Sequence, residues 1–197
     1  MKKLLTFAAS VALSLSLFTT NETASADSGK TIDTLQVNSF KEHVLESIKA
    51  DYPNAQFVDI TLEEYEQQKK ISDALSVTPY APAPPLSYVE VYAAISTNYP
   101  TYEYFSQNQL SSVQDHGGAE MYIVTEEIGY GHIRKAELNG SKLTEKQRLF
   151  IDYNNDTIID GYYIWWDASG HEDGSFYYEN TSTNYPWNKM FDSMYIK

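Results

Sequence analysis

The 197-residue sequence contains no cysteine, and its 14 lysines and arginines are outnumbered by 27 aspartates and glutamates. Without cysteine there can be no disulfide, thiol nucleophile, Cys-based zinc site or cysteine-linked lipid anchor. A net charge of −13 repels phosphate backbones and anionic membrane surfaces, which argues against nucleic acid as a partner. We therefore expect a protein with no membrane anchor that folds around an ordinary apolar core.

The N-terminal residues 1–26 have the features of a secretory signal peptide. Lys2 and Lys3 precede an apolar stretch, and a small-x-small cleavage signal ends at Ala26. The apolar stretch is too short and too rich in serine to span a bilayer stably. We expect cleavage after about Ala26 and a secreted mature chain that begins at Asp27.

The most specific motif is DYNNDTIIDG at residues 152–161, which has the spacing of a calcium-binding loop. Ca²⁺ prefers six to eight oxygen ligands, and alternate residues of a tight loop can direct their oxygens at one centre. Side chains would serve at loop positions 1, 3, 5 and 9 and a backbone carbonyl at position 7. The candidate ligands are Asp152, Asn154, Asp156, Asp160 and the carbonyl of Ile158.

The loop differs from a helix-flanked calcium site in three ways. Thr157 replaces the usual glycine, Tyr163 replaces the bidentate glutamate, and the flanking residues favour strands over helices. The sequence therefore predicts a structural Ca²⁺ site at a hairpin tip, with a dissociation constant of about 10⁻⁴–10⁻³ M. The alternative is a metal-free turn, because Asp and Asn favour turns by themselves.

Residues 27–75 form a predicted helical N-terminal segment. Apolar residues with one-faced spacing predict a helix over 38–50. A second helix is predicted from Thr61, because Thr61 and Glu64 have the spacing of a capping box. The proline-rich stretch 76–87 is predicted to be an extended linker.

Residues 88–197 have the alternating pattern of an antiparallel β domain. Asn139-Gly140 is a strong hairpin turn signal. We expect a mainly β fold, an antiparallel sandwich or barrel-like meander, with a short helical N-terminal segment. The predicted strands are 88–95, 120–128, 131–138, 148–151, 161–166 and 175–179.

Five features occur in a fixed order along the chain: a proline-rich lead, a YVEVYA strand, an HGG turn, a DG hairpin and IWWDASG. In this order the chain resembles a YolA-like family of small secreted proteins of bacilli, over about residues 79–197. The resemblance implies a secreted Gram-positive or prophage-encoded product, and it brings no established activity. It transfers only the calcium loop positions as candidate functional residues.

The sequence is rich in aromatic residues, with 17 Tyr, 8 Phe and 3 Trp. In a strand that begins at Gly161, Tyr163 and Trp165 lie on one face, and Trp166 lies on the other. One face could present an aromatic platform to sugar rings or peptides, which makes Tyr163, Trp165 and Trp166 candidate ligand-binding residues. The alternative is a core strand that is buried on both faces.

His116 is the histidine with the most suggestive surroundings. It precedes two glycines, and Asp115 and Glu120 are close enough in sequence to orient it. No Gly-x-Ser-x-Gly, HExxH or phosphate-loop motif accompanies it. A turn role is favoured over catalysis, and His116, Asp115 and Glu120 are only weak catalytic candidates.

Together these features predict a secreted, non-enzymatic, calcium-stabilised β-protein that binds an extracellular partner, either a cell-wall glycan or a protein. The alternative is a small secreted hydrolase of cell-wall or extracellular polymer that uses Asp and Glu with His116. A third interpretation treats residues 27–75 as a removable pro-segment.

Overall fold

The computed structural model describes residues 33–67, 84–156 and 158–197. The predicted signal peptide and residues 76–83 of the predicted linker lie outside the described residues, as does Thr157. Among the described residues, no helix has the length and apolar character needed to cross a membrane.

The N-terminal segment contributes a helix, a strand and a helical turn. The helix α1 (Asp33–Ile48) begins earlier than the predicted residue 38, and the strand β1 (Gln56–Val58) was not predicted. The helical stretch at 62–67 starts with the predicted capping box. The backbone N–H and hydroxyl of Thr61 donate to Glu64 Oε2 at 2.9 and 2.8 Å, and the Glu64 N–H donates to Thr61 Oγ1 at 3.2 Å.

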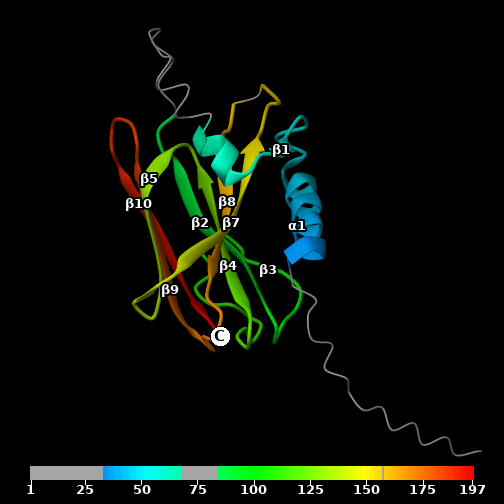
Figure 1. Cartoon of the computed structure of the whole chain (residues 1–197), viewed down its shortest axis with the longest axis vertical. Helices are drawn as coiled ribbons and strands as arrows, with labels where there is room; N and C mark the ends of the chain where they lie inside the picture. The colour runs from blue at the N-terminus through cyan, green and yellow to red at the C-terminus, as the bar shows by residue number, and fades with distance from the viewer. Residues whose placement is uncertain (1–32, 68–83, 157) are drawn as a thin grey trace, which may run out of the picture. The chain divides into compact units, whose positions relative to one another are not determined.

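The larger sheet has six antiparallel strands in the order β1-β7-β8-β4-β2-β3 (Figure 1). Besides β1, its strands are β2 (Tyr88–Ser96), β3 (Glu103–Tyr104), β4 (Met121–Ile128), β7 (Thr144–Asp152) and β8 (Gly161–Asp167).

The smaller sheet has four antiparallel strands in the order β10-β9-β5-β6. The predicted turn at Asn139-Gly140 joins β5 to β6, and both residues have positive φ angles, 51° and 79°. The strands are β5 (Gly131–Leu138), β6 (Ser141–Lys142), β9 (Gly174–Ser182) and β10 (Lys189–Ile196).

The two sheets form a sandwich, which confirms the predicted fold class. The chain does not follow a simple meander, because it changes sheet between β4 and β5, between β6 and β7, and between β8 and β9. Apolar side chains from both sheets meet in one core, which includes Ile123, Phe150, Ile164, Phe176 and Met194.

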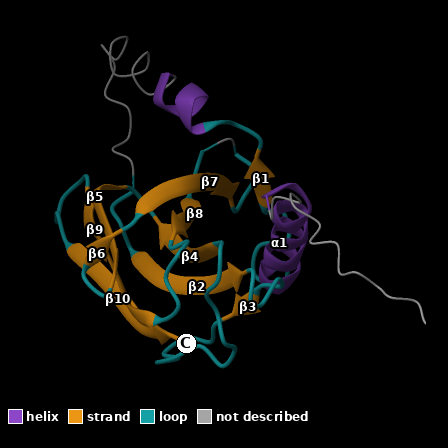
Figure 2. Cartoon of the chain, turned by 60° about the horizontal axis from the view of Figure 1, so that its bottom comes forward, coloured by secondary structure: helices purple, strands orange, loops and turns teal. Residues whose placement is uncertain are grey.

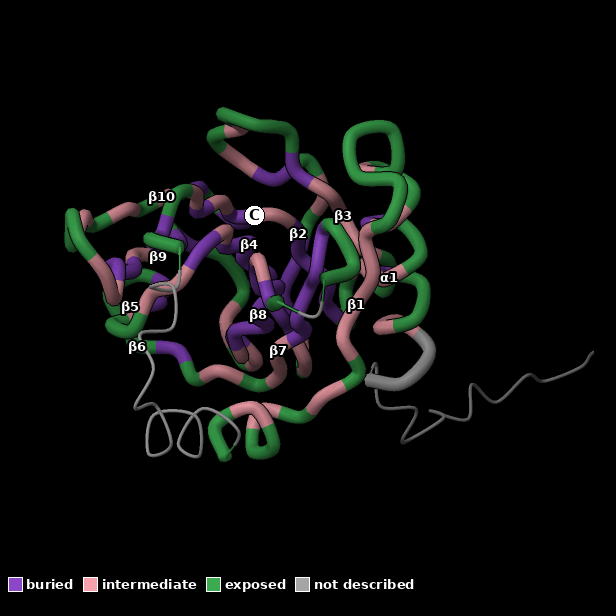
Figure 3. The backbone as a smooth tube through the Cα atoms, turned by 90° about the horizontal axis from the view of Figure 1, so that it is seen from above, coloured by how far each residue is buried: buried purple, intermediate pink, exposed green. Residues whose placement is uncertain are grey.

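The outer face of the larger sheet is covered by α1 (Figure 2). Phe40 and Val44 of the helix are fully buried. The Phe40 ring centroid lies 4.7 Å from that of Trp165 and 5.3 Å from that of Tyr163. Residues 33–67, the described part of the segment predicted as helical, therefore belong to the same compact unit as the sheets. As a result the central strands β2, β4 and β8 are buried on both faces (Figure 3).

Candidate functional site

The predicted calcium loop joins β7 to β8, so it is a strand–loop–strand hairpin as the sequence predicted. Asp152 is fully buried, and its Oδ1 accepts backbone N–H groups from three residues of the loop. The donors are Asn154 at 3.1 Å, Asn155 at 2.7 Å and Asp156 at 3.3 Å. This side chain therefore shapes the turn from within.

The other candidate ligands are also bonded to the backbone of the loop. Asn154 Oδ1 accepts the Asp156 N–H at 3.1 Å, and Asp156 Oδ1 accepts the Ile158 N–H at 2.8 Å. Asp160 Oδ2 accepts the Tyr153 N–H at 2.8 Å.

Burial is the main reason that the pKa of Asp160 is raised, and the charges of Asp152 and Asp156 add to the rise. A bound cation would oppose that repulsion. In the part of the chain that the structure describes, however, no group of three His, Cys, Asp or Glu side chains is arranged to hold a metal ion. Calcium binding by this loop stays a prediction.

The predicted aromatic platform on β8 is wrong. Tyr163 is 1 % exposed, and Trp165 and Trp166 are each 4 % exposed. The helix α1 covers the face with Tyr163 and Trp165, and the smaller sheet covers the face with Trp166. All three residues therefore lie in the core, and none of them can present its ring to a ligand.

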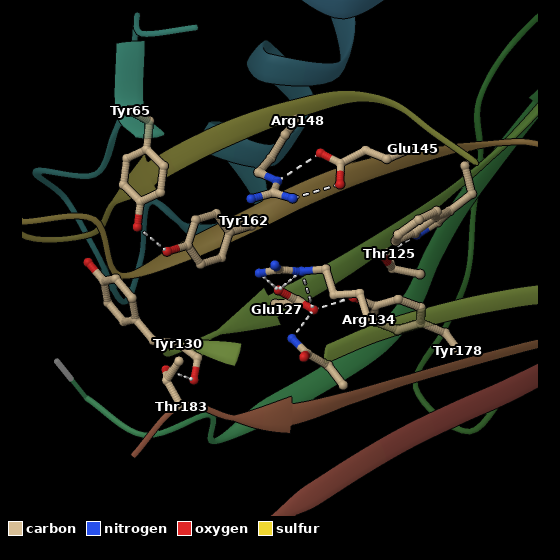
Figure 4. Close-up of polar contacts among 12 residues, drawn as sticks. Tyr65, Thr125, Glu127, Tyr130, Arg134, Glu145, Arg148, Tyr162, Tyr178 and Thr183 are labelled. Carbon is tan, nitrogen blue, oxygen red and sulfur yellow. Dashed lines mark hydrogen bonds and ion pairs between the residues drawn. The ribbon is translucent and has the colours of Figure 1, made fainter. Parts of the chain in front are cut away.

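The least expected chemistry lies between the two sheets, around Glu127 of β4 (Figure 4). This side chain is fully buried, and Arg134 of β5 donates to its Oε2 from Nε at 3.0 Å and from Nη2 at 2.7 Å. On β9, Asn180 Nδ2 donates to Oε1 at 2.5 Å, and the Tyr178 hydroxyl donates to the same oxygen. No local sequence pattern predicted this cluster, because its members come from three strands.

A second ion pair lies on β7, across the ring of Tyr162 from the first (Figure 4). Arg148 donates to Glu145 from Nε at 2.9 Å and from Nη2 at 2.6 Å. The guanidinium carbons of Arg134 and Arg148 lie 5.4 and 5.6 Å from the centroid of Tyr162. At these distances both cations interact favourably with the ring.

The cluster around Glu127 is built to be inert. Burial by itself would lower the pKa of Arg134, but the charge and hydrogen bonds of Glu127 outweigh burial and raise it. Burial, followed by the negative charge of Glu127, raises the pKa of Tyr178 well above its usual range. Glu127 thus accepts bonds from groups that do not release their protons near neutral pH. It is a cross-link between the sheets, without a free oxygen lone pair directed at a substrate site.

His116 is fully buried and hydrogen-bonded on both ring nitrogens. Its Nε2 lies 3.0 Å from Glu103 Oε2, and its Nδ1 lies 3.3 Å from Ser96 Oγ. The sequence suggested Asp115 and Glu120 as partners, but Asp115 is exposed and the acid that bonds the ring is Glu103. Glu103 was missed because it lies on β3, whose two residues carry no strand signal.

The order Ser96, His116, Glu103 resembles a catalytic relay, but its burial prevents that role. Ser96 is fully buried, and its Oγ also accepts the backbone N–H of Tyr99 at 3.1 Å. Burial lowers the pKa of His116, although the nearby Glu103 opposes this change. The buried, neutral imidazole of His116 therefore links its own loop to Ser96 at the end of β2. This is a structural role in a turn.

A groove of 690 Å³ lies between α1, residues 59–64 and β7. Its acids are Asp59, Glu64 and Glu145. Glu64 is bonded in the capping box and Glu145 in the ion pair with Arg148. The groove does not include His116, so it does not supply the convergent acids and histidine that the hydrolase interpretation requires.

Exposed aromatic rings do occur, on the outer face of β10 and in the turn between β9 and β10. Within β10 the side chains alternate, so that Phe191 and Tyr195 face outward and are 64 % and 41 % exposed. Just before β10, Trp187 is 64 % exposed and packs edge-to-face against Tyr185 at 5.5 Å. We call these four residues the aromatic face. No strand was predicted over residues 189–196, so the sequence did not place Phe191 and Tyr195 on a sheet face.

The charged side chains around the aromatic face neutralise one another. Lys189 Nζ lies 3.0 Å from Glu179, and Lys135 Nζ lies 2.9 Å from Glu137. The Tyr177 hydroxyl donates to Glu179 at 2.7 Å, and the Tyr177 ring stacks on Phe191. Among the described residues of β5, β9 and β10, the outward-facing charged side chains are thus two lysines and two glutamates, which form two ion pairs.

A family model described as Domain of unknown function (DUF4879) matches residues 81–196, which is more than half of the chain. The matched region includes every strand except β1, and it contains both the calcium loop and the aromatic face. No curated protein and no solved structure matches the chain.

Proposed function

We propose, for a chain that belongs to the family Domain of unknown function (DUF4879), that it is an exported, non-enzymatic protein that binds a partner in the cell wall or outside the cell. The observation that carries this proposal is the aromatic face. Exposed Tyr and Trp residues are enriched in binding surfaces, and water contact with such large rings is costly unless a partner covers them. The groups that would support catalysis are instead buried or bonded to one another.

Export is supported by the sequence of residues 1–26, and it requires the mature chain to begin near Asp27. The packing of Phe40 and the pairing of β1 with β7 support retention of the N-terminal segment. Intact-mass analysis of a culture supernatant tests both points. A secreted form that begins near residue 76 would contradict retention.

The calcium loop supports a bracing role in this proposal. It connects two strands of the larger sheet, whereas the aromatic face belongs to the smaller sheet. Bound Ca²⁺ is therefore expected to stabilise the fold and to leave partner affinity unchanged well below the melting temperature.

The test is a pulldown of the mature protein on purified Gram-positive cell wall. We expect the wild type to bind and the double variant Trp187→Ala, Phe191→Ala to bind much less, because two exposed rings are lost. The control is Tyr52→Ala, which removes a 44 % exposed ring that follows α1. Equal retention of wild type and double variant would show that the aromatic face is not the binding surface.

A further inference from the structure

We propose that the ligand of the aromatic face is a neutral glycan, with sugar rings stacked on Trp187, Phe191 and Tyr195. This inference rests on the proposed function and names the class of ligand that the face accepts. It follows from the placement of the rings, the pairing of the charges and the polar groups between the rings.

The outward-facing rings of β10 are spaced along the strand, and Tyr177 of β9 stacks on one of them, Phe191. Phe191 and Tyr195 are four residues apart on the same face of β10, which separates them by about 13 Å along the strand. Trp187 lies in the turn just before the strand, where it provides a third exposed ring in the same hairpin. Separated rings along a hairpin suit an extended chain with a repeating unit, because each ring can receive one unit.

The rings also have the electronic character that a sugar requires. An aromatic face carries partial negative charge, and the axial C–H groups of a pyranose ring carry partial positive charge. Between the rings lie the ammonium of Lys189 and the carboxylate of Glu179, which can donate to and accept from sugar hydroxyls.

The charges select a neutral ligand. The chain as a whole has a net charge of −13, which disfavours a polyanion. A polycation would be drawn to unpaired carboxylates, but Glu137 and Glu179 are each paired with a lysine, and Asp173 accepts the hydroxyl of Tyr195 at 2.9 Å. A protein partner generally needs a contiguous apolar centre, whereas here the stacked rings of Tyr177 and Phe191 are bordered by the ion pair of Lys189 and Glu179.

Tryptophan fluorescence provides a direct test, because the chain has three tryptophans and two of them, Trp165 and Trp166, are buried. Quenching by acrylamide therefore reports mainly on Trp187. With a β-1,4-linked N-acetylglucosamine hexamer or cellohexaose as the probe, we expect a blue shift and protection from quenching. A lysine decapeptide is expected to cause neither.

The affinity of the hexamer is then measured by calorimetry for the wild type and the variants. Phe191→Ala and Tyr195→Ala are each expected to weaken binding by about tenfold, whereas Phe191→Tyr should retain it. Circular dichroism checks that each variant is folded, and these exposed positions are not part of the core. Hexamer binding that is equal in wild type and in the alanine variants would overturn the inference.

The inference and the proposed function fail in different ways. If neither oligosaccharide binds but the cell-wall pulldown still depends on Trp187 and Phe191, then the face binds something other than a neutral glycan and the inference is wrong. Protection by the lysine decapeptide alone would likewise overturn it in favour of a peptide ligand. If the pulldown is independent of both residues, the proposed function itself is wrong.

Discussion

Glu126 and Glu127 are adjacent in β4, and their buried carboxylates lie on opposite faces of the larger sheet. Glu127 is paired with Arg134, whereas Glu126 accepts the hydroxyls of Tyr163 at 2.6 Å and Tyr153 at 3.1 Å. Burial raises the pKa of Glu126, the two hydroxyl bonds oppose this rise, and the charge of Glu90 adds to it. Glu126 is thus a weaker acid in the folded protein than in the unfolded chain.

The substitution Glu126→Gln should reveal this difference through the pH dependence of stability. Because the folded state raises the pKa of Glu126 above its usual 4.5, the folded protein binds this proton more tightly than the unfolded chain. The stabilisation is complete below pH 4.5 and is lost as the pH rises through the folded pKa. Glutamine does not titrate. The stability of the variant relative to wild type should therefore increase as the pH rises through the folded pKa of Glu126.

Urea unfolding at a series of pH values measures this effect. Far-UV circular dichroism can follow the transition, and the slope of the free energy with denaturant checks that unfolding stays two-state. A constant difference between variant and wild type from pH 4 to pH 8 would contradict the assignment.

Local signals in the sequence predicted some residue roles well. The capping box at Thr61 and Glu64 and the turn at Asn139-Gly140 are confirmed, because each depends on a few neighbouring residues. The partner of His116 could not be predicted, since Glu103 reaches it only after β3 pairs with β2. Signals that need two distant segments to meet are absent from the local pattern.

At the scale of elements, α1 is the clearest case of a segment whose role is set by what it covers. Its Phe40 contacts the rings of Tyr163 and Trp165 from β8. It also contacts the rings of Tyr92 in β2, Tyr104 in β3 and Tyr102 just before β3. Without the helix, the outer face of the larger sheet would expose these rings to water.

The variant Phe40→Ala should therefore destabilise the protein by about 3–5 kcal/mol, the usual cost of removing a fully buried phenylalanine. Emission from Trp165 should also shift to the red as water enters. The matched control is Glu42→Ala, an exposed position of the same helix, for which we expect a change within about 0.5 kcal/mol. A stability loss equal to that of the control would mean that the helix is dispensable.

The loop between β7 and β8 gives a second prediction at this scale. Millimolar Ca²⁺ should raise the melting temperature relative to EDTA, because binding to the folded state alone adds to its stability. Asp156→Ala should abolish the increase while the protein still folds, since this residue is exposed. If neither protein responds to Ca²⁺, the loop is a metal-free turn held by Asp152.

The strands themselves were largely predictable, but their sheets were not. Alternation along 88–95 and 120–128 correctly located β2 and β4. The same alternation cannot say which sheet a strand joins, because both sheets bury one face in the same core. The wrong prediction of an aromatic platform on β8 has a similar origin. The aromatic residues of β8 correctly predicted a strand, but they could not show that α1 covers its second face.

At the scale of the whole molecule, polar groups fasten the two sheets together on both sides of the apolar core. On one side Glu127 of the larger sheet holds Arg134 and Asn180 of the smaller sheet. On the other side Asp192 of β10 accepts the N–H of Val91 at 2.8 Å, at the bulge in β2.

Loss of the charge on Glu127 should lower the stability of the protein strongly. Glu127→Gln leaves the Arg134 guanidinium buried without its counter-charge, and we expect a loss of about 3–5 kcal/mol in the free energy of unfolding. The exposed pair provides a matched control, because Glu137→Gln should change stability by only about 0–1 kcal/mol. Chemical denaturation of both variants measures the contrast, and similar losses would show that Glu127 is not a special cross-link.

The edges of the two sheets have a consequence for how the protein behaves when concentrated. Three of them are closed by very short strands: β1 has three residues, and β3 and β6 have two each. The fourth, β10, exchanges backbone hydrogen bonds with residues 110–112. A long free edge invites strand addition between molecules and the growth of fibrils. Among the described residues, the fold therefore leaves no long free strand edge, and we expect concentrated protein to resist the growth of fibrils.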